Sequence, residues 1–226
     1  MWILGIIILG VSCGVIQAQH AMCRQSDTDR CLPSGPLTSF PVTEEELEEA
    51  CAFYRRFLAC IVEYRDNCGF RKIETVYTEN GKLDMLIDTH REICQPTTSL
   101  HSSFVANLPC FEDIYENDFT LCQERTSGYI HRLHSTLASK KSSSNNSLFK
   151  MYDCLFIILH TNCFAVQANE RCGSRARNIV LEIIEKLGLV QEDCLEIMYD
   201  DVVEAMEILE FLTNEKIYVK KFLEKM

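Results

Sequence analysis

Two long segments of the chain carry apolar residues at the spacing of an α-helix. In the segment from 47 to 69 the steps are three and four residues, as in an amphipathic helix, and the positions are Leu47, Cys51, Tyr54, Leu58 and Ile61. Burial on more than one face is predicted because the stripe is widened by Phe53, Phe57 and Cys60. In the second segment, from 154 to 173, residues 155–159 are apolar on every side, as in a central buried helix.

Residues typical of helix ends flank these segments. Thr43 is followed by three glutamates, the last of them Glu46, which has the form of a capping box at the start of a helix. Gly69 closes the first segment, in a position that suits the end of a helix. Further helices are predicted over 83–94, after a turn at 79–81, over 174–187, ended by Gly188, and over 191–212. No strand-like alternation is found, so the predicted fold class is all-α.

The N-terminus predicts export. Residues 2–16 are almost wholly apolar and no Lys or Arg precedes them. A run of this length is too short to cross a bilayer, which needs about 20 residues, but it suits the core of a signal peptide cleaved after Ala18. The alternative is a buried N-terminal helix. No later segment approaches membrane-spanning length, so we expect a secreted, soluble mature protein.

The number of cysteines indicates the same compartment. Of the 13 cysteines, Cys13 lies in the predicted signal peptide, and its removal leaves an even number, as complete pairing requires. Secreted chains form and keep disulfides, so we expect every mature cysteine to be oxidised. Cysteine makes up about 6% of the mature chain, below the 8–10% of scaffolds made mostly of disulfides. A hydrophobic core is therefore expected as well.

The cysteines repeat in two sets of six. The triplet within 51–68 has steps of nine and eight residues, the triplet within 154–172 has steps of nine and nine, and glycine follows each. Constant spacing in packed elements with variable loops is typical of a duplicated unit, although chance spacing is an alternative. We predict a signal peptide over 1–18, two related six-cysteine helical units over 19–97 and 98–212, and a basic amphipathic tail over 213–226.

Helical geometry restricts the pairing. Cys51 and Cys60 would lie about 13.5 Å apart along a helix and on opposite faces, whereas a disulfide needs Cα atoms about 4.4–6.8 Å apart. Each triplet cysteine must therefore reach another segment, and a returning helix would bring Cys94 level with Cys51. Among about 15 possible pairings per unit, we expect Cys51–Cys94, Cys31–Cys60 and Cys23–Cys68, and then Cys154–Cys194, Cys122–Cys163 and Cys110–Cys172.

The charge disfavours some partners. The chain has 33 acidic and 22 basic residues, a formal net charge of −11, whereas nucleic acids and anionic membranes attract clustered positive charge. Residues 215–226 reverse this balance with four lysines among apolar residues. Such a segment either docks on the acidic body or binds a membrane or an acidic partner. The polar stretch 139–147 predicts an exposed loop, in which Asn145 begins an N-glycosylation sequon.

No residue pattern indicates catalysis or a cofactor. His131 and His134 can share one face of a helix, but a zinc site needs three or four protein ligands and no third is indicated. The chain has no Gly-x-Ser-x-Gly elbow, no His-Glu-x-x-His motif and no phosphate-binding glycine loop. Fully paired cysteines leave no thiolate nucleophile. We therefore expect no metal, no cofactor and no enzymatic activity, with an unrecognised hydrolase as the alternative.

The cysteine framework resembles that of known secreted proteins. A signal peptide, a helical body and the pattern C-x8-C-x7-C-G, repeated as C-x8-C-x8-C-G, resemble the secreted cysteine-rich helical proteins of arthropods and nematodes, such as the haemolymph 27 kDa glycoprotein-like group. The resemblance implies a secreted all-α fold without a defined activity. GDNF-receptor-type helical domains are a more distant analogue and imply protein binding. Saposins and insect odorant-binding proteins have close cysteine pairs that are absent here.

These observations predict a secreted, non-enzymatic binding protein without a nucleic-acid partner or a membrane span. Its partner is an extracellular protein or a small hydrophobic ligand. A protein-binding module predicts an exposed apolar patch between the units. A carrier predicts a cavity of about 300–1,000 Å³, lined by residues such as Phe53, Phe57, Phe156 and Ile157. A hydrolase predicts a cleft where histidine and carboxylate side chains converge.

Overall fold

The computed structural model describes Cys23, Ser26, residues 30–32, 39–69, 82–139 and 145–188, Cys194 and Ala205. The elements in these ranges are α-helices, and no strand occurs among them: α3 (Glu44–Cys68), α4 (Lys82–Cys94), α5 (Ser99–Val105), α6 (Leu108–Ser139), α7 (Asn145–Cys172) and α8 (Ser174–Lys186). The predicted fold class, all-α, is confirmed for this part of the chain. The predicted signal peptide and the basic tail lie outside the described residues.

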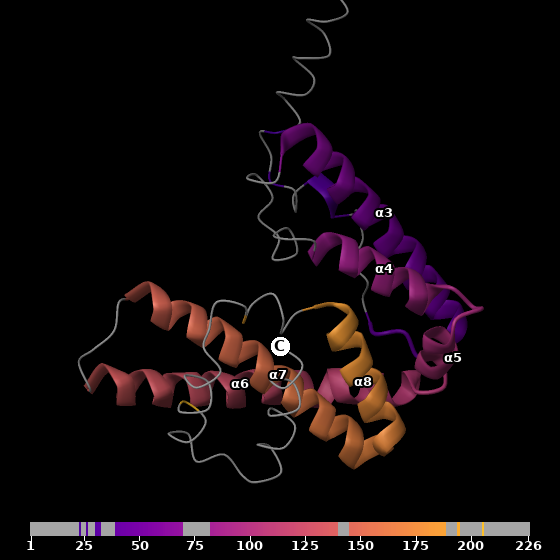
Figure 1. Cartoon of the computed structure of the whole chain (residues 1–226). Coiled ribbons are helices and arrows are strands. Elements are labelled where there is room, and N and C mark those ends of the chain that lie inside the picture. The colour runs from indigo at the N-terminus through magenta and orange to yellow at the C-terminus, as the bar shows by residue number, and fades with distance from the viewer. Residues whose placement is uncertain are drawn as a thin grey trace, which may run out of the picture.

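The helices form two groups, which Figure 1 shows one above the other. The first group is α3 with α4, and the second is α6, α7 and α8, in which α7 contacts both of its neighbours. The short helix α5 contacts α4 and α8, and α4 also contacts α8. The two groups therefore meet along α4, α5 and α8.

The start of α3 follows the predicted cap. The Thr43 hydroxyl accepts a hydrogen bond from the Glu46 amide at 3.2 Å, and Glu46 Oε2 accepts one from the Val42 amide at 2.8 Å. The helix ends at Gly69, whose φ of 77° is in the left-handed region that favours glycine. Its amide donates to the Arg65 carbonyl at 2.8 Å. Both predicted ends of this helix are confirmed.

The second triplet lies on the most deeply buried helix. Several side chains of α7 have no solvent exposure, namely Cys154, Leu155, Ile158, Ala165 and Ala168. This agrees with the apolar run at 155–159, because α7 packs between α6 and α8. Gly173, with φ of 83°, separates α7 from α8 by a single residue. The turn is so short that α8 folds straight back onto α7.

The other predicted helices agree in part. The predicted helices 83–94 and 174–187 correspond to α4 and α8, and Gly188 has the left-handed φ of 61° expected beyond a helix end. The predicted helix 191–212 lies outside the described residues, apart from Cys194 and Ala205, which are helical and buried. One prediction is wrong: Asn145 begins α7 instead of lying in a loop. Ser139 likewise ends α6, so both ends of the polar stretch 139–147 belong to helices.

Six disulfides join the described cysteines, and they are the same pairs that the spacing predicts. The first group holds Cys23–Cys68, Cys31–Cys60 and Cys51–Cys94. The second holds Cys110–Cys172, Cys122–Cys163 and Cys154–Cys194. In both sets the first cysteine pairs with the fifth, the second with the fourth and the third with the sixth. Each triplet helix is therefore attached to three other positions of the chain.

Candidate functional site

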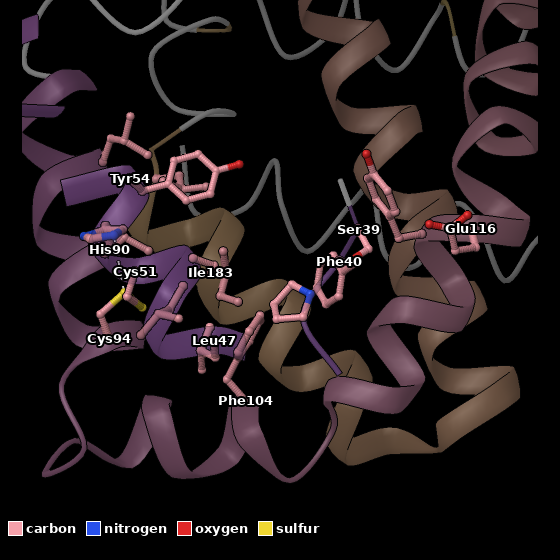
Figure 2. A pocket seen from close by; sticks show the side chains of 17 residues that line it. Ser39, Phe40, Leu47, Cys51, Tyr54, His90, Cys94, Phe104, Glu116 and Ile183 are labelled. Carbon is pink, nitrogen blue, oxygen red and sulfur yellow. Dashed lines mark hydrogen bonds between the residues drawn. A yellow bond between two sulfur atoms is a disulfide. The ribbon is translucent and has the colours of Figure 1, made fainter. Parts of the chain in front are cut away.

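A cavity of about 430 Å³ lies where the two groups of helices meet. Apolar side chains of α3 and α4, and of α8 and the residue that follows it, line the cavity, namely Leu47, Ala50, Leu86, Ile93, Ile183 and Leu187. The segment 39–41 also lines the cavity and contributes Phe40, which Figure 2 shows among the other lining side chains. Because both groups contribute to the wall, the cavity depends on how they pack together.

Aromatic rings hold the segment 39–41 in place. The centroid of the Phe40 ring is 6.4 Å from that of Phe104 and 5.6 Å from that of Tyr115. Phe104 stacks in turn on Phe111, with centroids 5.2 Å apart. Tilted aromatic pairs at these distances attract one another beyond the area they bury. Phe40 therefore joins α5 to α6 and forms part of the cavity wall.

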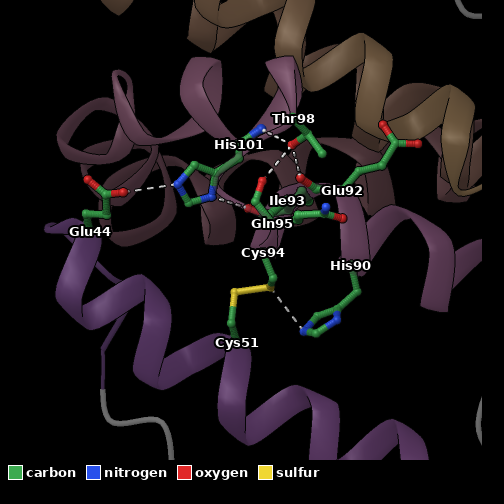
Figure 3. The surroundings of a disulfide bond; sticks show 9 residues. All are labelled: Glu44, Cys51, His90, Glu92, Ile93, Cys94, Gln95, Thr98 and His101. Carbon is green, nitrogen blue, oxygen red and sulfur yellow. Dashed lines mark hydrogen bonds and ion pairs between the residues drawn. A yellow bond between two sulfur atoms is a disulfide. The ribbon is translucent and has the colours of Figure 1, made fainter.

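The Cys51–Cys94 disulfide and His90 form the wall at the α3–α4 side. His90 Nε2 lies 3.3 Å from Cys94 Sγ, one helical turn away on α4, as Figure 3 shows. Burial lowers the pKa of His90, and the nearby Arg55 cation lowers it further, while a hydrogen bond with the Cys51 backbone acts in the opposite direction. The imidazole is therefore neutral at pH 7.

The same three residues have the proximity of metal ligands. Among the described residues, the ligand atoms of Cys51, His90 and Cys94 all lie within 4.8 Å of one another. However, zinc binds cysteine as the thiolate, and both sulfurs are bonded to each other in the disulfide. The cluster therefore forms a covalent wall of the cavity with one imidazole beside it.

His101 connects three helices next to this wall. Its Nδ1 lies 2.8 Å from the Ile93 carbonyl at the end of α4, and its Nε2 lies 3.2 Å from Glu44 Oε1 at the start of α3 (Figure 3). Only 4% of His101 is exposed. The ring thus contacts an oxygen atom on each of two other helices. This residue fixes α5 against the first group.

A second polar contact joins the groups on the α8 side. Lys186 Nζ lies 2.9 Å from Glu92 Oε1, which connects α8 to α4. A hydrogen bond with Glu92 raises the pKa of Lys186. Lys186 precedes Leu187 and Glu92 precedes Ile93, and both of these apolar neighbours line the cavity. The ion pair therefore connects α8 to α4 beside two residues of the wall.

The mouth of the cavity carries polar and aromatic side chains. Tyr54 and Tyr115 are 46% and 47% exposed, and Glu116 is also exposed at the α6 side. In Figure 2 Tyr54 and His90 lie on one side and Glu116 on the opposite side. The prediction that Tyr54 belongs to the core stripe of α3 is wrong, because its ring lies at the cavity mouth, edge-on to His90 with centroids 6.3 Å apart.

A row of aromatic rings continues from the mouth along α6 and α7. Tyr115 contacts Phe119, and Phe119 lies edge-on to His160 with centroids 5.7 Å apart. His160 stacks on Phe156 and contacts Phe164. Burial lowers the pKa of His160, partly offset by a hydrogen bond with the Cys122 backbone, and its Nδ1 has no hydrogen-bond partner.

The structure brings together other residues than those expected for a carrier. The cavity has a volume in the predicted range, but it is not lined by Phe53, Phe57, Phe156 or Ile157. Phe57 and Ile157 pack against the cores of their own helical groups instead. His131 and His134 are exposed on α6. Sequence reasoning missed Phe40, His90 and Glu116, which come from three distant segments and share no motif.

Comparison with known proteins gives no relatives. No protein-family model matches the chain, and no match is found among curated proteins or solved structures. Within the described ranges, every helix is too short or too polar to cross a membrane.

Proposed function

We propose that this chain is a secreted, non-enzymatic binding protein that carries a small hydrophobic ligand in the cavity between its two groups of helices. The observation that carries the proposal is the cavity of about 430 Å³. Cavities that bind small molecules commonly measure about 300–1,000 Å³ and are mostly apolar with a few polar groups. The apolar walls and the polar mouth described above fit this description.

The fixed geometry of the walls also supports a ligand site. The Cys51–Cys94 disulfide, the His101 contacts and the Lys186–Glu92 pair all restrain elements that line the cavity. A site that is formed before binding loses little conformational entropy when the ligand enters. The two groups would thus hold an open site without first having to rearrange.

Secretion and duplication belong to the same proposal. Twelve paired cysteines and the apolar N-terminal run support export through an oxidising compartment. The equal pairing order in the two cysteine sets supports descent from one duplicated unit. The resemblance to the haemolymph 27 kDa glycoprotein-like class supports an extracellular fluid as the site of action, with Asn145 as a glycosylation site.

A fluorescence titration with N-phenyl-1-naphthylamine, a neutral hydrophobic probe, tests the carrier function. The wild-type protein is expected to bind the probe with a rise in fluorescence. Ala50→Phe fills the cavity from α3 and should abolish this rise, whereas Ala52→Phe, on the exposed side of the same helix, should retain it. Circular dichroism and a thiol count establish that both variants fold. Equal binding by folded Ala50→Phe would exclude the cavity as the binding site.

Protein binding is a second candidate, favoured by the exposed aromatic row on α6. Tyr115 and Phe119 are one turn apart and 47% and 39% exposed. Exposed aromatic side chains are common in protein interfaces. Native mass spectrometry of protein taken from its own secretion separates the two candidates. A bound small molecule supports the carrier, and a stoichiometric protein that is lost in Phe119→Ser supports the interface.

A further inference from the structure

We infer that the cavity selects hydrophobic ligands that carry a protonated amine, an inference that rests on the proposed carrier function. The charge of the wall favours such ligands. Among the described residues that line the cavity, Glu116 is the only Asp or Glu, and none is Lys or Arg. The described walls therefore present one formal charge, a negative one, near the cavity mouth.

The remaining ionisable groups do not cancel this charge. His90 lies in the wall, but burial and the Arg55 cation lower its pKa, so it is neutral at pH 7. Lys186 lies close to the lining residue Leu187, but its ammonium group is paired with Glu92 at 2.9 Å. Arg55 is exposed on α3 and does not line the cavity. No unpaired positive charge therefore faces a ligand from the described walls.

The same groups determine where the ammonium would lie. Arg55 is close enough to His90 to lower its pKa, so it also disfavours a second cation at the α3–α4 end. Glu116 lies on the opposite side of the cavity in Figure 2. A ligand amine is thus attracted to the α6 side, with its apolar body towards Ile93 and Ile183.

Two aromatic residues, Phe40 and Tyr115, line the cavity near its α6 side. Tyr115 precedes Glu116 in the chain, and its ring lies 5.6 Å from Phe40 between centroids, with an interplanar angle of 33°. The faces of aromatic rings attract ammonium groups through their quadrupole. A carboxylate beside two rings combines Coulomb attraction with cation–π contacts, and a carboxylate ligand would be repelled by both.

The charge of the whole chain favours the same ligands. With a net charge of −11, the protein attracts cations over a distance of about 8–10 Å at ordinary ionic strength. This long-range term alone does not select a site, because it acts at any position on an acidic surface. It adds to the local contribution of Glu116, which is specific to the cavity.

Three probes with the same ten-carbon chain test this inference: decylamine, decan-1-ol and decanoate. Their affinities are measured at pH 7 by displacement of N-phenyl-1-naphthylamine from the full chain. Decylamine is expected to bind about tenfold more tightly than decanoate, with decanol between them, because an exposed ion pair contributes up to about fivefold in each direction. Glu116→Gln should weaken decylamine binding about three- to fivefold and leave decanol binding unchanged.

Glu124→Gln is the matched control, since Glu124 is exposed on the same helix but does not line the cavity. It removes the same charge from the protein and should leave the preference for decylamine intact. Equal binding of the three probes, or an equal loss in both variants, would overturn the inference while leaving the carrier function standing. Failure of all three probes and of the fluorescent probe would overturn the carrier function itself.

Discussion

The two triplet helices, α3 and α7, carry the same cysteine pattern in different surroundings. The sixth cysteine of the first set, Cys94, ends α4, which contacts α3 directly. The sixth cysteine of the second set, Cys194, lies beyond α8 and packs in a core with Cys154 and Leu133. The first two cysteines of the second set both lie on the single long helix α6, whereas Cys23 and Cys31 precede α3. One order of pairing thus accommodates two different packing arrangements.

The two triplet helices also differ in how deeply they are buried. α7 is covered on two sides by helices, and three cysteines of the second set are fully buried, namely Cys122, Cys154 and Cys194. α3 is covered mainly by α4, and its Tyr54 reaches the cavity mouth. The second group is therefore the better packed part, while the first group provides more of the open site.

Loss of a central disulfide should distinguish the two groups most strongly. Cys154→Ala/Cys194→Ala removes a disulfide that closes a loop of 40 residues, and Cys31→Ala/Cys60→Ala removes one that closes a loop of 29. By loop entropy, each removal should lower the free energy of unfolding by about 4 kcal/mol. Cys154→Ala/Cys194→Ala also leaves a space in a fully buried core, which adds about 1–2 kcal/mol to the loss. We expect the larger fall in the free energy of unfolding for Cys154→Ala/Cys194→Ala, measured by urea denaturation.

The comparison of the two double variants is the control, because both remove one bridge and two sulfurs. An equal loss of stability would mean that chain entropy alone sets the contribution of a disulfide here. A larger loss for the Cys31 and Cys60 variant would contradict the difference in packing.

The sequence predicts much of the fold because its signals are local. Helix periodicity, the Thr43 cap and the two glycines act within a few residues, and the expected disulfide pairs use helix length together with the spacing of the cysteines. The cavity could not be predicted, because Phe40, His90 and Glu116 meet only after α4, α6 and the segment 39–41 pack together. Tyr54 illustrates the limit: its helical register matches the core stripe, but the opposing surface at that level is a cavity.

Loss of the His101 contacts should have the next largest effect on the free energy of unfolding. His101→Ala removes both hydrogen bonds and leaves the Ile93 carbonyl without its partner, which we expect to cost about 2–3 kcal/mol. Glu44→Gln retains an oxygen acceptor and should cost less. Urea denaturation measures both. A His101→Ala protein as stable as the wild type would show that α5 is held by apolar packing alone.

Two arginines near the ends of the triplet helices allow a further comparison. Arg171 on α7 pairs with Asp113 and with Asp118, which is only 3% exposed. Arg65 on α3 pairs with Asp84, whose side chain is 72% exposed. Arg171→Met leaves a buried carboxylate unpaired, so its urea midpoint should fall further than that of Arg65→Met. The reverse order would contradict the role of the buried carboxylate.

Acid should destabilise both groups through one histidine each. Burial lowers the pKa of His90 and of His160, whereas the unfolded histidine titrates near its ordinary value of about 6.5. Below that value the unfolded chain binds more protons than the folded one, so stability falls with falling pH until the folded histidines are protonated as well. Well above that value the two histidines contribute no pH dependence.

Free energies of unfolding at pH 7.5 and 5.5 test this sign, in a range chosen to lie above the ordinary pKa values of the carboxyl groups. His90→Gln and His160→Gln should each reduce the loss of stability between the two pH values, and His131→Gln, at an exposed position of α6, is the control. Of these two histidines, only His90 has its pKa lowered by the Arg55 cation. Arg55→Gln should therefore reduce the loss of stability between the two pH values in the wild-type background but not in the His90→Gln background. An unchanged pH dependence in the two buried-histidine variants would assign the acid response to other groups.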